Sequence, residues 1–430
     1  KLQNTFFINT CAVTKEAEKQ ARQKIRKIRR ENPKAKIIVT GCSAQINPKI
    51  YKNMQEVDLV LGNEEKFNFD KYLNLLNSET SEMVVNNIMS VKETANHFIN
   101  GFDKKARAFI QIQTGCDHRC TFCIIPYARG NSRSVPIVKI CKQIKILLDK
   151  GFKEIVLSGV DLTSYGNDLL EKPKLGQLVK KLFKDIKNLE RLRLSSLDAI
   201  EIDKDLQDVI CHEERLMPHL HLSIQSGDDM ILKRMKRRHL RKDVINLCNK
   251  LKKFRNNIVF GADIIAGFPT ETNEMFQNSE KILDECDLTY LHIFPYSSRP
   301  NTPASKMPQV PQQIIKERAK LLRIKAKKIL KKFLNDLNQK ATFFVNKLEA
   351  IKNTYNHLIN EIRGRGFLLG IKIKINNSIF IEKLRNNGLL SVGANENIIR
   401  ILPPLNVTNK DLKIALKIIE KTCMDINSKR

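Results

Sequence analysis

The sequence has no tryptophan, and aromatic residues make up only 6% of its 430 residues. No segment reaches the roughly 18 consecutive apolar residues that a membrane-spanning helix needs, so we expect no membrane partner. The opening residues "KLQNTFFINTC" lack the layout of a signal peptide. We therefore expect a cytoplasmic protein, in which the ten cysteines serve as metal ligands or buried thiols rather than disulfides.

Acidic residues are also scarce. The sequence has 46 Asp and Glu against 76 Lys and Arg, which gives a formal net charge of +30. A positive surface potential favours polyanions, above all nucleic acid. A compositional explanation stays open, because the chain is also rich in Lys, Asn and Ile, as proteins of AT-rich genomes are. The length predicts two or three domains.

Short apolar runs alternate with helical patterns through most of the chain, which predicts an α/β fold with parallel strands. Residues 1–80 are expected to form a first α/β domain, followed by a polar linker at 81–104. Strands are expected in this domain at 5–9, 36–40 and 57–62, with helices at 14–31 and 48–54.

A longer alternation follows and predicts a partial (β/α)6 barrel over 105–300, because right-handed crossovers curl such a sheet. Its strands are expected at 108–113, 154–159, 191–196, 219–224, 258–265 and 289–294. A proline-rich break and a Lys-rich helix, about 312–336, make up 301–340, and a small α/β segment occupies 341–430. In parallel sheets the functional groups lie at the carboxyl ends of the strands.

Three cysteines lie within eight residues just after the first barrel strand, in "QIQTGCDHRCTFC" (111–123). The thiolates of Cys116, Cys120 and Cys123 can hold three irons of a [4Fe-4S] cluster and leave the fourth iron open to a small molecule. Zinc is the alternative, but structural zinc takes four protein ligands, and His118 would have to fold back to complete the set.

These cysteines, together with longer strings, resemble the radical S-adenosylmethionine (SAM) enzymes, and among them the methylthiotransferases. Within that family the chain is most similar to the branch that acts on threonylcarbamoyladenosine in tRNA, over about residues 3 to 338. The strings are "NTCAVTKEAEKQARQKIRK", "GCDHRCTFCIIPYARG", "LSGVDLTSYG", "HLHLSIQSGDDMILKRMKRRH" and "DIIAGFPTET".

The resemblance implies that Cys116, Cys120 and Cys123 hold a [4Fe-4S] cluster whose open iron binds SAM. Reductive cleavage of SAM, with electrons from a reducing donor, would give a radical that removes hydrogen from C2 of the modified adenine at position 37 of tRNA. A second cluster on the N-terminal domain would supply the sulfur. The motifs "NTC" and "TGC" provide two of its three expected ligands, Cys11 and Cys42.

Residues at the strand ends are candidates for cofactor contact on this interpretation. Phe122 is placed to pack on the adenine of SAM, and its alternative role is ordinary core. The other candidates end the second, fourth and fifth barrel strands, with turn formation as the alternative. They are Gly159, Asp161, Gln225, Ser226, Gly267, Phe268 and Pro269.

The basic run "KRMKRRH" (233–239) follows a strand-end loop, where RNA would approach the barrel. A solvated helix face is the alternative to phosphate contact. Candidates for phosphate contact are Arg234, Lys236, Arg237 and Arg238, with Arg26, Arg29 and Arg30 on the first helix. The remaining cysteines have no partner spacing and are expected to be small buried side chains. They are Cys141, Cys211, Cys248, Cys286 and Cys423.

The two ends of the chain depart from the family. The third N-terminal cysteine should precede Cys11 together with an opening strand, and neither is present in the sequence as given. Residues 341–430 resemble the last part of acetylornithine-type aminotransferases, whose carboxylate-binding arginine matches Arg400. Aminotransferase activity is not expected, because the domain with the Schiff-base lysine is missing. A truncated or fused tRNA-binding product is therefore an alternative, as is a sister enzyme acting on another substrate.

Overall fold

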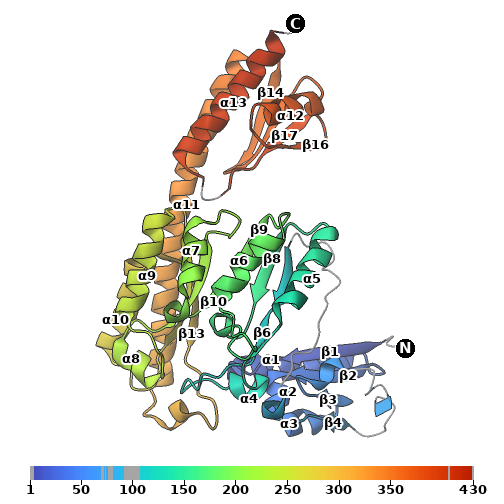
Figure 1. Ribbon diagram of the computed structural model, residues 1–430, viewed down its shortest axis with the longest axis vertical. Helices are drawn as coiled ribbons and strands as arrows, with labels where there is room; N and C mark the ends of the chain where they lie inside the picture. The colour runs from blue at the N-terminus through green and yellow to red at the C-terminus, as the bar shows by residue number, and fades with distance from the viewer. Residues whose placement is uncertain are drawn as a thin grey trace. The chain divides into compact units, whose positions relative to one another are not determined.

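The computed structural model describes residues 4–68, 72, 74–75, 81–91, 107–404 and 407–428, without the side chains of 332–334. The chain divides into two compact units, Lys1–Ala326 and Lys327–Arg430 (Figure 1). Within the described residues, no helix combines the length and the apolar character that crossing a membrane requires.

A parallel sheet in the order β1-β2-β3-β4 opens the first unit. Thr14 caps the first helix by accepting a hydrogen bond from the backbone of Ala17, and acidic residues in the first turn suit the helix dipole. The elements are β1 (Thr5–Thr10), α1 (Lys15–Glu31), β2 (Lys36–Gly41), α2 (Cys42–Ile46), α3 (Pro48–Lys52), β3 (Leu59–Leu61) and β4 (Glu82–Val84).

Strand β4 lies in the stretch 81–104, which the sequence predicted to be a linker. This strand was not predicted, because its three residues show no alternation of apolar and polar side chains. Its pairing partner is β3, in which all three residues are buried. The fourth strand therefore depends on a contact across the sheet rather than on local pattern.

The six predicted barrel strands are present, and all of their pairings are parallel. The third of them is divided at Ser195 into β9 and β10, so two sheets result, β5-β8-β9 and β10-β11-β12-β13. The strands are β5 (Arg107–Gln111), β8 (Glu154–Ser158), β9 (Arg191–Leu194), β10 (Ser196–Leu197), β11 (His219–Gln225), β12 (Val259–Ala266) and β13 (Leu288–Pro295). This architecture confirms the predicted α/β partial barrel.

Helices follow the strands along the barrel (Figure 1). The main ones are α5 (Ile137–Asp149), α6 (Leu175–Asp185), α7 (Lys204–His212), α8 (Asp229–Arg234), α9 (Arg241–Phe254) and α10 (Asn273–Glu285). Two smaller features surround the three-cysteine segment, the antiparallel pair β6 (Gln113–Thr114) and β7 (Arg133–Ser134), and the short helix α4 (Ile125–Arg129).

Strand β11 shows why the barrel has one apolar and one polar face. Its sequence HLHLSIQ alternates, so that Leu220, Leu222 and Ile224 are buried while the residues between them are only half-buried. Successive side chains of a strand point to opposite faces. The histidines, Ser223 and Gln225 therefore share the face that is free to build a site.

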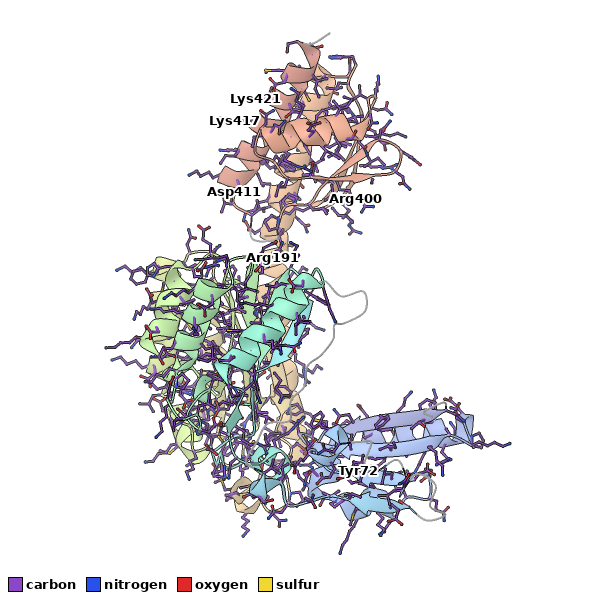
Figure 2. The ribbon with its side chains drawn as sticks, turned by 45° about the vertical axis from the view of Figure 1, so that its right-hand side comes forward. Tyr72, Arg191, Arg400, Asp411, Lys417 and Lys421 are labelled. Carbon is purple, nitrogen blue, oxygen red and sulfur yellow. The ribbon has the colours of Figure 1, made fainter. Side chains whose placement is uncertain are left out.

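The second unit has an antiparallel sheet in the order β14-β15-β17-β16, with Phe344, Ile371, Phe380 and Ile419 in its core. Helix α11 (Gln312–Thr354) enters it and runs past residue 336, where the sequence predicted a helix end. The other elements are β14 (Ile359–Arg365), β15 (Leu368–Ile373), α12 (Asn377–Asn386), β16 (Val392–Ala394), β17 (Ile398–Ile401) and α13 (Asn409–Asn427). Figure 2 shows the side chains of this unit, with labels on exposed basic residues of β17 and α13.

Candidate active site

The three-cysteine segment follows β6 as a loop tied to its surroundings through the backbone. The Cys116 amide donates to the carbonyl of Gly130, and the Thr121 amide donates to that of Met235. At Gly115, with φ +74°, a Cβ would lie 1.9 Å from the carbonyl oxygen of Asn131, so the loop requires glycine there. The loop is therefore held in place by its neighbours.

The three thiols of this loop are half-buried, as metal ligands near a pocket should be. Burial, with a smaller contribution from Cys120, raises the pKa of the Cys123 thiol to about 11. Burial and the Asp161 carboxylate likewise raise the pKa of Cys116. A bound cationic centre reverses this preference, because metal binding displaces the thiol proton.

The donor set tests whether the residues fit a cluster. Three thiols on one loop, Cys116, Cys120 and Cys123, can each supply one ligand to an iron of a [4Fe-4S] core, which is Cys-ligated. A structural zinc ion takes four protein ligands, and the histidine of this loop, His118, is engaged by Asp161 and Glu201. The three thiols therefore fit the cluster.

Asp161, predicted to contact SAM, lies against the cysteine loop. Its Oδ2 is 3.5 Å from the Cys116 sulfur, 2.9 Å from His118 Nε2 and 2.7 Å from the Ser164 hydroxyl. These contacts orient the carboxylate and engage His118 in a charged hydrogen bond. The ring of His118 also lies 3.6 Å from Glu201.

Arg237, predicted to contact RNA phosphate, is directed inwards. Its guanidinium pairs with Asp198 at 2.9 Å, donates to the carbonyl of Ser223 at 2.8 Å and is 9% exposed. One of its nitrogens is 3.9 Å from the Cys120 sulfur. This geometry gives Arg237 an electrostatic position beside the cysteine loop.

The other basic candidates of this run differ in exposure. Arg234 is half-buried and donates to the Thr270 hydroxyl at 2.8 Å. Arg238 pairs with Glu201, yet its side chain remains 43% exposed, and Lys236 is exposed. Phosphate contact by Lys236 and Arg238 stays a prediction.

Three of the four arginines of α1 were predicted to contact phosphate, and they lie in the C-terminal part of the helix. Arg29 is engaged by the protein itself, with its Nη2 2.6 Å from Asp58 and 2.9 Å from the carbonyl of Glu56. Arg26 lies 3.7 Å from Glu56 and is mostly exposed, as is Arg30. Phosphate contact by Arg26 and Arg30 also stays a prediction.

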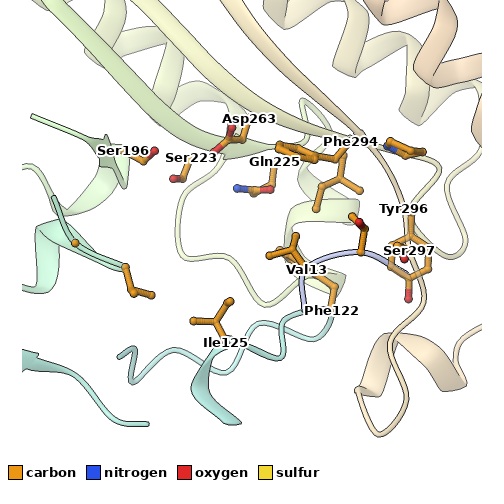
Figure 3. A pocket seen from close by; sticks show the side chains of 15 residues that line it. Val13, Phe122, Ile125, Ser196, Ser223, Gln225, Asp263, Phe294, Tyr296 and Ser297 are labelled. Atoms are coloured by element: carbon orange, nitrogen blue, oxygen red, sulfur yellow. The ribbon is translucent and has the colours of Figure 1, made fainter. Parts of the chain in front are cut away.

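A pocket of about 350 Å³ lies at the carboxyl ends of the barrel strands, next to the cysteine loop (Figure 3). Phe122, Gly159 and Gln225, predicted from the sequence, belong to its wall. The full lining comprises Val13, Thr14, Phe122, Ile125, Gly159, Val160, Ser196, Ser223, Gln225, Asp263, Ile265, Phe294, Pro295, Tyr296 and Ser297.

Several wall residues were not predicted from the sequence. Ser223 and Asp263 precede the strand ends by two or more residues, and the alternation of β11 and β12 could have placed them on the same face as Gln225. Val13 comes from the loop after β1, and the Lys15 amide donates to Ser297 across the two domains of this unit. No local sequence signal predicts that contact.

Four predicted cofactor residues lie behind the pocket wall. The ring of Phe268 is fully buried and meets Phe122 edge-on at 6.3 Å. Gly267 has φ +74°, a conformation that favours glycine, and a Cβ there would lie 2.6 Å from Ile315. Ser226 bonds to Ser279, and Pro269 is buried. These residues support the wall from the core side.

Cys11 and Cys42 follow two neighbouring parallel strands whose last residues, Thr10 and Gly41, are register partners. Cys11 is exposed, whereas Cys42 is buried. Arg129 Nε donates to the Cys42 sulfur at 3.2 Å. Because Arg129 ends α4, which follows Cys123, one short helix connects the two groups of cysteines.

The remaining cysteines are not all buried, as the sequence had predicted. Cys248, Cys286 and Cys423 are, and the Cys248 and Cys286 thiols are hydrogen-bonded to each other. Cys141 and Cys211 are partly exposed. Both lie on helices that cover the barrel, where one edge of a helix meets solvent.

Comparison with known families agrees with this geometry. The model of the Radical SAM superfamily matches residues 110–283, that of Uncharacterized protein family UPF0004 matches 3–62, and that of Aminotransferase class-III matches 318–423. A solved radical SAM methyltransferase, TsrM from Kitasatospora setae with cobalamin and a [4Fe-4S] cluster, shares the fold with a TM-score of 0.52 at 16% identity, covering 70% of this chain and 65% of its own. The fold and the three-cysteine loop define a radical SAM enzyme.

Curated relatives show to which family of radical SAM enzymes the chain belongs. Threonylcarbamoyladenosine tRNA methylthiotransferase MtaB of Rickettsia prowazekii is 61% identical over 322 residues, which cover 75% of this chain and 76% of the relative. The protein of the same name from Aquifex aeolicus is 42% identical, over 74% of this chain and 78% of the relative. The chain belongs to the MtaB family of methylthiotransferases.

Proposed function

We propose that this chain is a tRNA methylthiotransferase that converts N6-threonylcarbamoyladenosine at position 37 to its 2-methylthio derivative. The observation that carries the proposal is the 61% identity to MtaB of Rickettsia prowazekii over 322 residues. The two family matches at 3–62 and 110–283 include every cysteine of both predicted cluster sites. The pocket beside the cysteine loop supplies a place for the reaction.

Cys116, Cys120 and Cys123 hold the [4Fe-4S] cluster in this proposal. When bound, the cluster would supply the one-electron reduction of SAM on which methylthiolation at C2 of adenine depends. The protein contributes position and electrostatics. Phe122 packs on the cofactor from a wall supported by Phe268, since the two rings meet edge-on.

The polar side of the pocket positions the modified nucleoside. Ser223, Gln225 and Asp263 contribute polar groups to its lining, and Val13 and Thr14 line it from the N-terminal domain. The substrate adenine, in the single-stranded anticodon loop, can be splayed out to reach the pocket.

In this proposal Cys11 and Cys42 hold the sulfur-donating cluster. The reaction takes place in the cytoplasm, and a reducing partner supplies the electrons. A second candidate is a tRNA-binding product without sulfur insertion. It is favoured by one observation, that the described strand ends of the N-terminal sheet present only these two thiols beside each other. Iron content after anaerobic reconstitution separates the two, at about eight or about four irons per chain.

An in vitro reaction tests the proposal. The reconstituted chain is incubated anaerobically with SAM, dithionite and an anticodon stem-loop that carries threonylcarbamoyladenosine. The proposal predicts 5′-deoxyadenosine together with the 2-methylthio nucleoside, and no product with an isopentenyladenosine stem-loop. SAM cleavage without thiolation would support the second candidate, and product on the isopentenyl substrate alone would indicate the sister enzyme.

A further inference from the structure

Three neighbouring barrel strands bring two histidines and an aspartate together, apart from the cysteine loop. Asp263 Oδ1 on β12 is 2.9 Å from His221 Nε2 on β11 and 3.2 Å from His292 Nδ1 on β13. The three ligand atoms all lie within 4.8 Å of one another. The proposed reaction uses only Asp263 of this group, as part of the pocket lining, and gives no role to His221 or His292.

Gly261 makes room for this arrangement. It is the register partner of His221, and a Cβ at Gly261 would lie 2.8 Å from the Nδ1 atom of that ring. The same Cβ would lie 2.9 Å from the carbonyl oxygen of Tyr290, so any other residue would shift the imidazole, the backbone of β13 or both. The ring of His292 lies alongside, 4.7 Å away between centroids.

The spacing matches the donor atoms of one metal ion. Metal–nitrogen and metal–oxygen bonds of about 2.0–2.2 Å bring adjacent ligand atoms to about 3 Å, close to the two distances observed here. Two imidazoles and one carboxylate form the donor set that zinc and ferrous iron accept. We propose that His221, Asp263 and His292 bind one divalent transition-metal cation, Zn²⁺ or Fe²⁺.

Three protein ligands leave a coordination position for water or a substrate oxygen. Asp263 is part of the pocket wall, so this position is next to the pocket (Figure 3). The inference does not depend on the proposed function, because it requires neither SAM cleavage nor tRNA. The competing explanation is a carboxylate that accepts hydrogen bonds from two imidazoles without an ion.

Zinc binding by the cluster-loaded chain distinguishes these explanations. The protein is reconstituted with iron and sulfide so that its cluster cysteines are occupied, equilibrated with Zn²⁺ and freed of excess metal. Zinc per chain is measured by inductively coupled plasma mass spectrometry, and its ligands by X-ray absorption at the zinc edge. The variants are Asp263→Asn, His292→Gln and Gly261→Ala. His212→Gln is the matched control, because His212 is also 64% exposed and also contacts a carboxylate, Asp208.

The proposal predicts one zinc per chain with nitrogen and oxygen neighbours at about 2.0–2.2 Å and no sulfur at about 2.3 Å. Asp263→Asn and His292→Gln lose this zinc, and Gly261→Ala weakens binding by about tenfold or more, while His212→Gln retains it. All variants should keep the wild-type content of acid-labile sulfide, which belongs to the cluster and not to this site, and this shows that the barrel has folded. Zinc that is absent, bound through sulfur or unaffected by Asp263→Asn would overturn the proposal. Loss of methylthiolation with zinc binding intact would count against the proposed function alone.

Discussion

Arg299 and Glu18 form a buried ion pair between the two domains of the first unit, with 2.5 Å between Arg299 Nη2 and Glu18 Oε1. Their side chains are 4% and 14% exposed. The same Glu18 oxygen accepts a hydrogen bond from Ser43, the residue after Cys42. The pair therefore fixes α1 and the Cys42 segment to the loop that follows β13.

Removing Glu18 should release this contact. Glu18→Ala leaves the Arg299 guanidinium buried without its partner, which costs about 3–5 kcal/mol. We expect a free energy of unfolding lower by that amount in urea denaturation, and faster hydrogen exchange at residues 12–18 and 295–303. Glu16→Ala, on the exposed side of the same helix, should change neither. Equal effects of both substitutions would contradict the role of the pair.

Each cysteine of the loop should be required for SAM cleavage. Cys116→Ala, Cys120→Ala or Cys123→Ala removes one of three ligands of the cluster, so 5′-deoxyadenosine formation under reducing conditions should fall to background. Cys211→Ala, also partly exposed, should keep both iron content and cleavage. Survival of cleavage in any of the three loop variants would show that the cluster assignment is wrong.

Phe268 should matter for stability and, through Phe122, for the cofactor. Phe268→Ala opens a cavity between Phe122 and Tyr296, whose rings lie 6.3 and 5.6 Å from it. Such truncations cost about 3–5 kcal/mol. We also expect weaker SAM binding by equilibrium dialysis. Phe254→Ala is the control, since that ring is 57% exposed. Unchanged stability of the Phe268 variant would contradict this packing.

Glu271 should make stability depend on pH. Burial raises the pKa of its carboxyl to about 7 despite the opposing charge of Arg318, and one of its oxygens has no hydrogen-bond partner among the described residues. A carboxyl whose pKa is higher in the folded state stabilises the fold at low pH. That contribution is complete below the unfolded value of about 4.5 and is lost as pH rises through about 7.

The change in the free energy of unfolding from this group is about 3 kcal/mol between pH 4.5 and pH 7.5. The wild type and Glu271→Gln are compared by urea denaturation across this range. From pH 4.5 to pH 7.5, the free energy of unfolding of the wild type should fall by that amount relative to that of the variant. Glu274→Gln, in the first turn of α10 and exposed, should give a constant difference. A constant difference for Glu271→Gln as well would mean that the carboxyl is ionised throughout.

The local pattern of apolar and polar residues was sufficient to predict most of the barrel strands and some of the residues that line the pocket. The six strands were predictable because their apolar residues alternate or run continuously, and Phe122 and Gln225 were found because functional groups follow strand ends. The division at Ser195 and the short strand β4 depend on pairing with distant strands. Arg237 was predicted to contact phosphate because it belongs to a basic run after a strand-end loop. In the structure it pairs instead with Asp198, which lies far away in the sequence. Burial of such a charge is visible only once the chain has folded.

The most direct test of the central claim is mass spectrometry of tRNA nucleosides from a bacterial strain that lacks its own enzyme and expresses this chain. We expect that 2-methylthio-threonylcarbamoyladenosine appears, and that it disappears with Cys120→Ala. Accumulation of the unthiolated nucleoside alone, in cells that contain the soluble protein with its cluster, would contradict it.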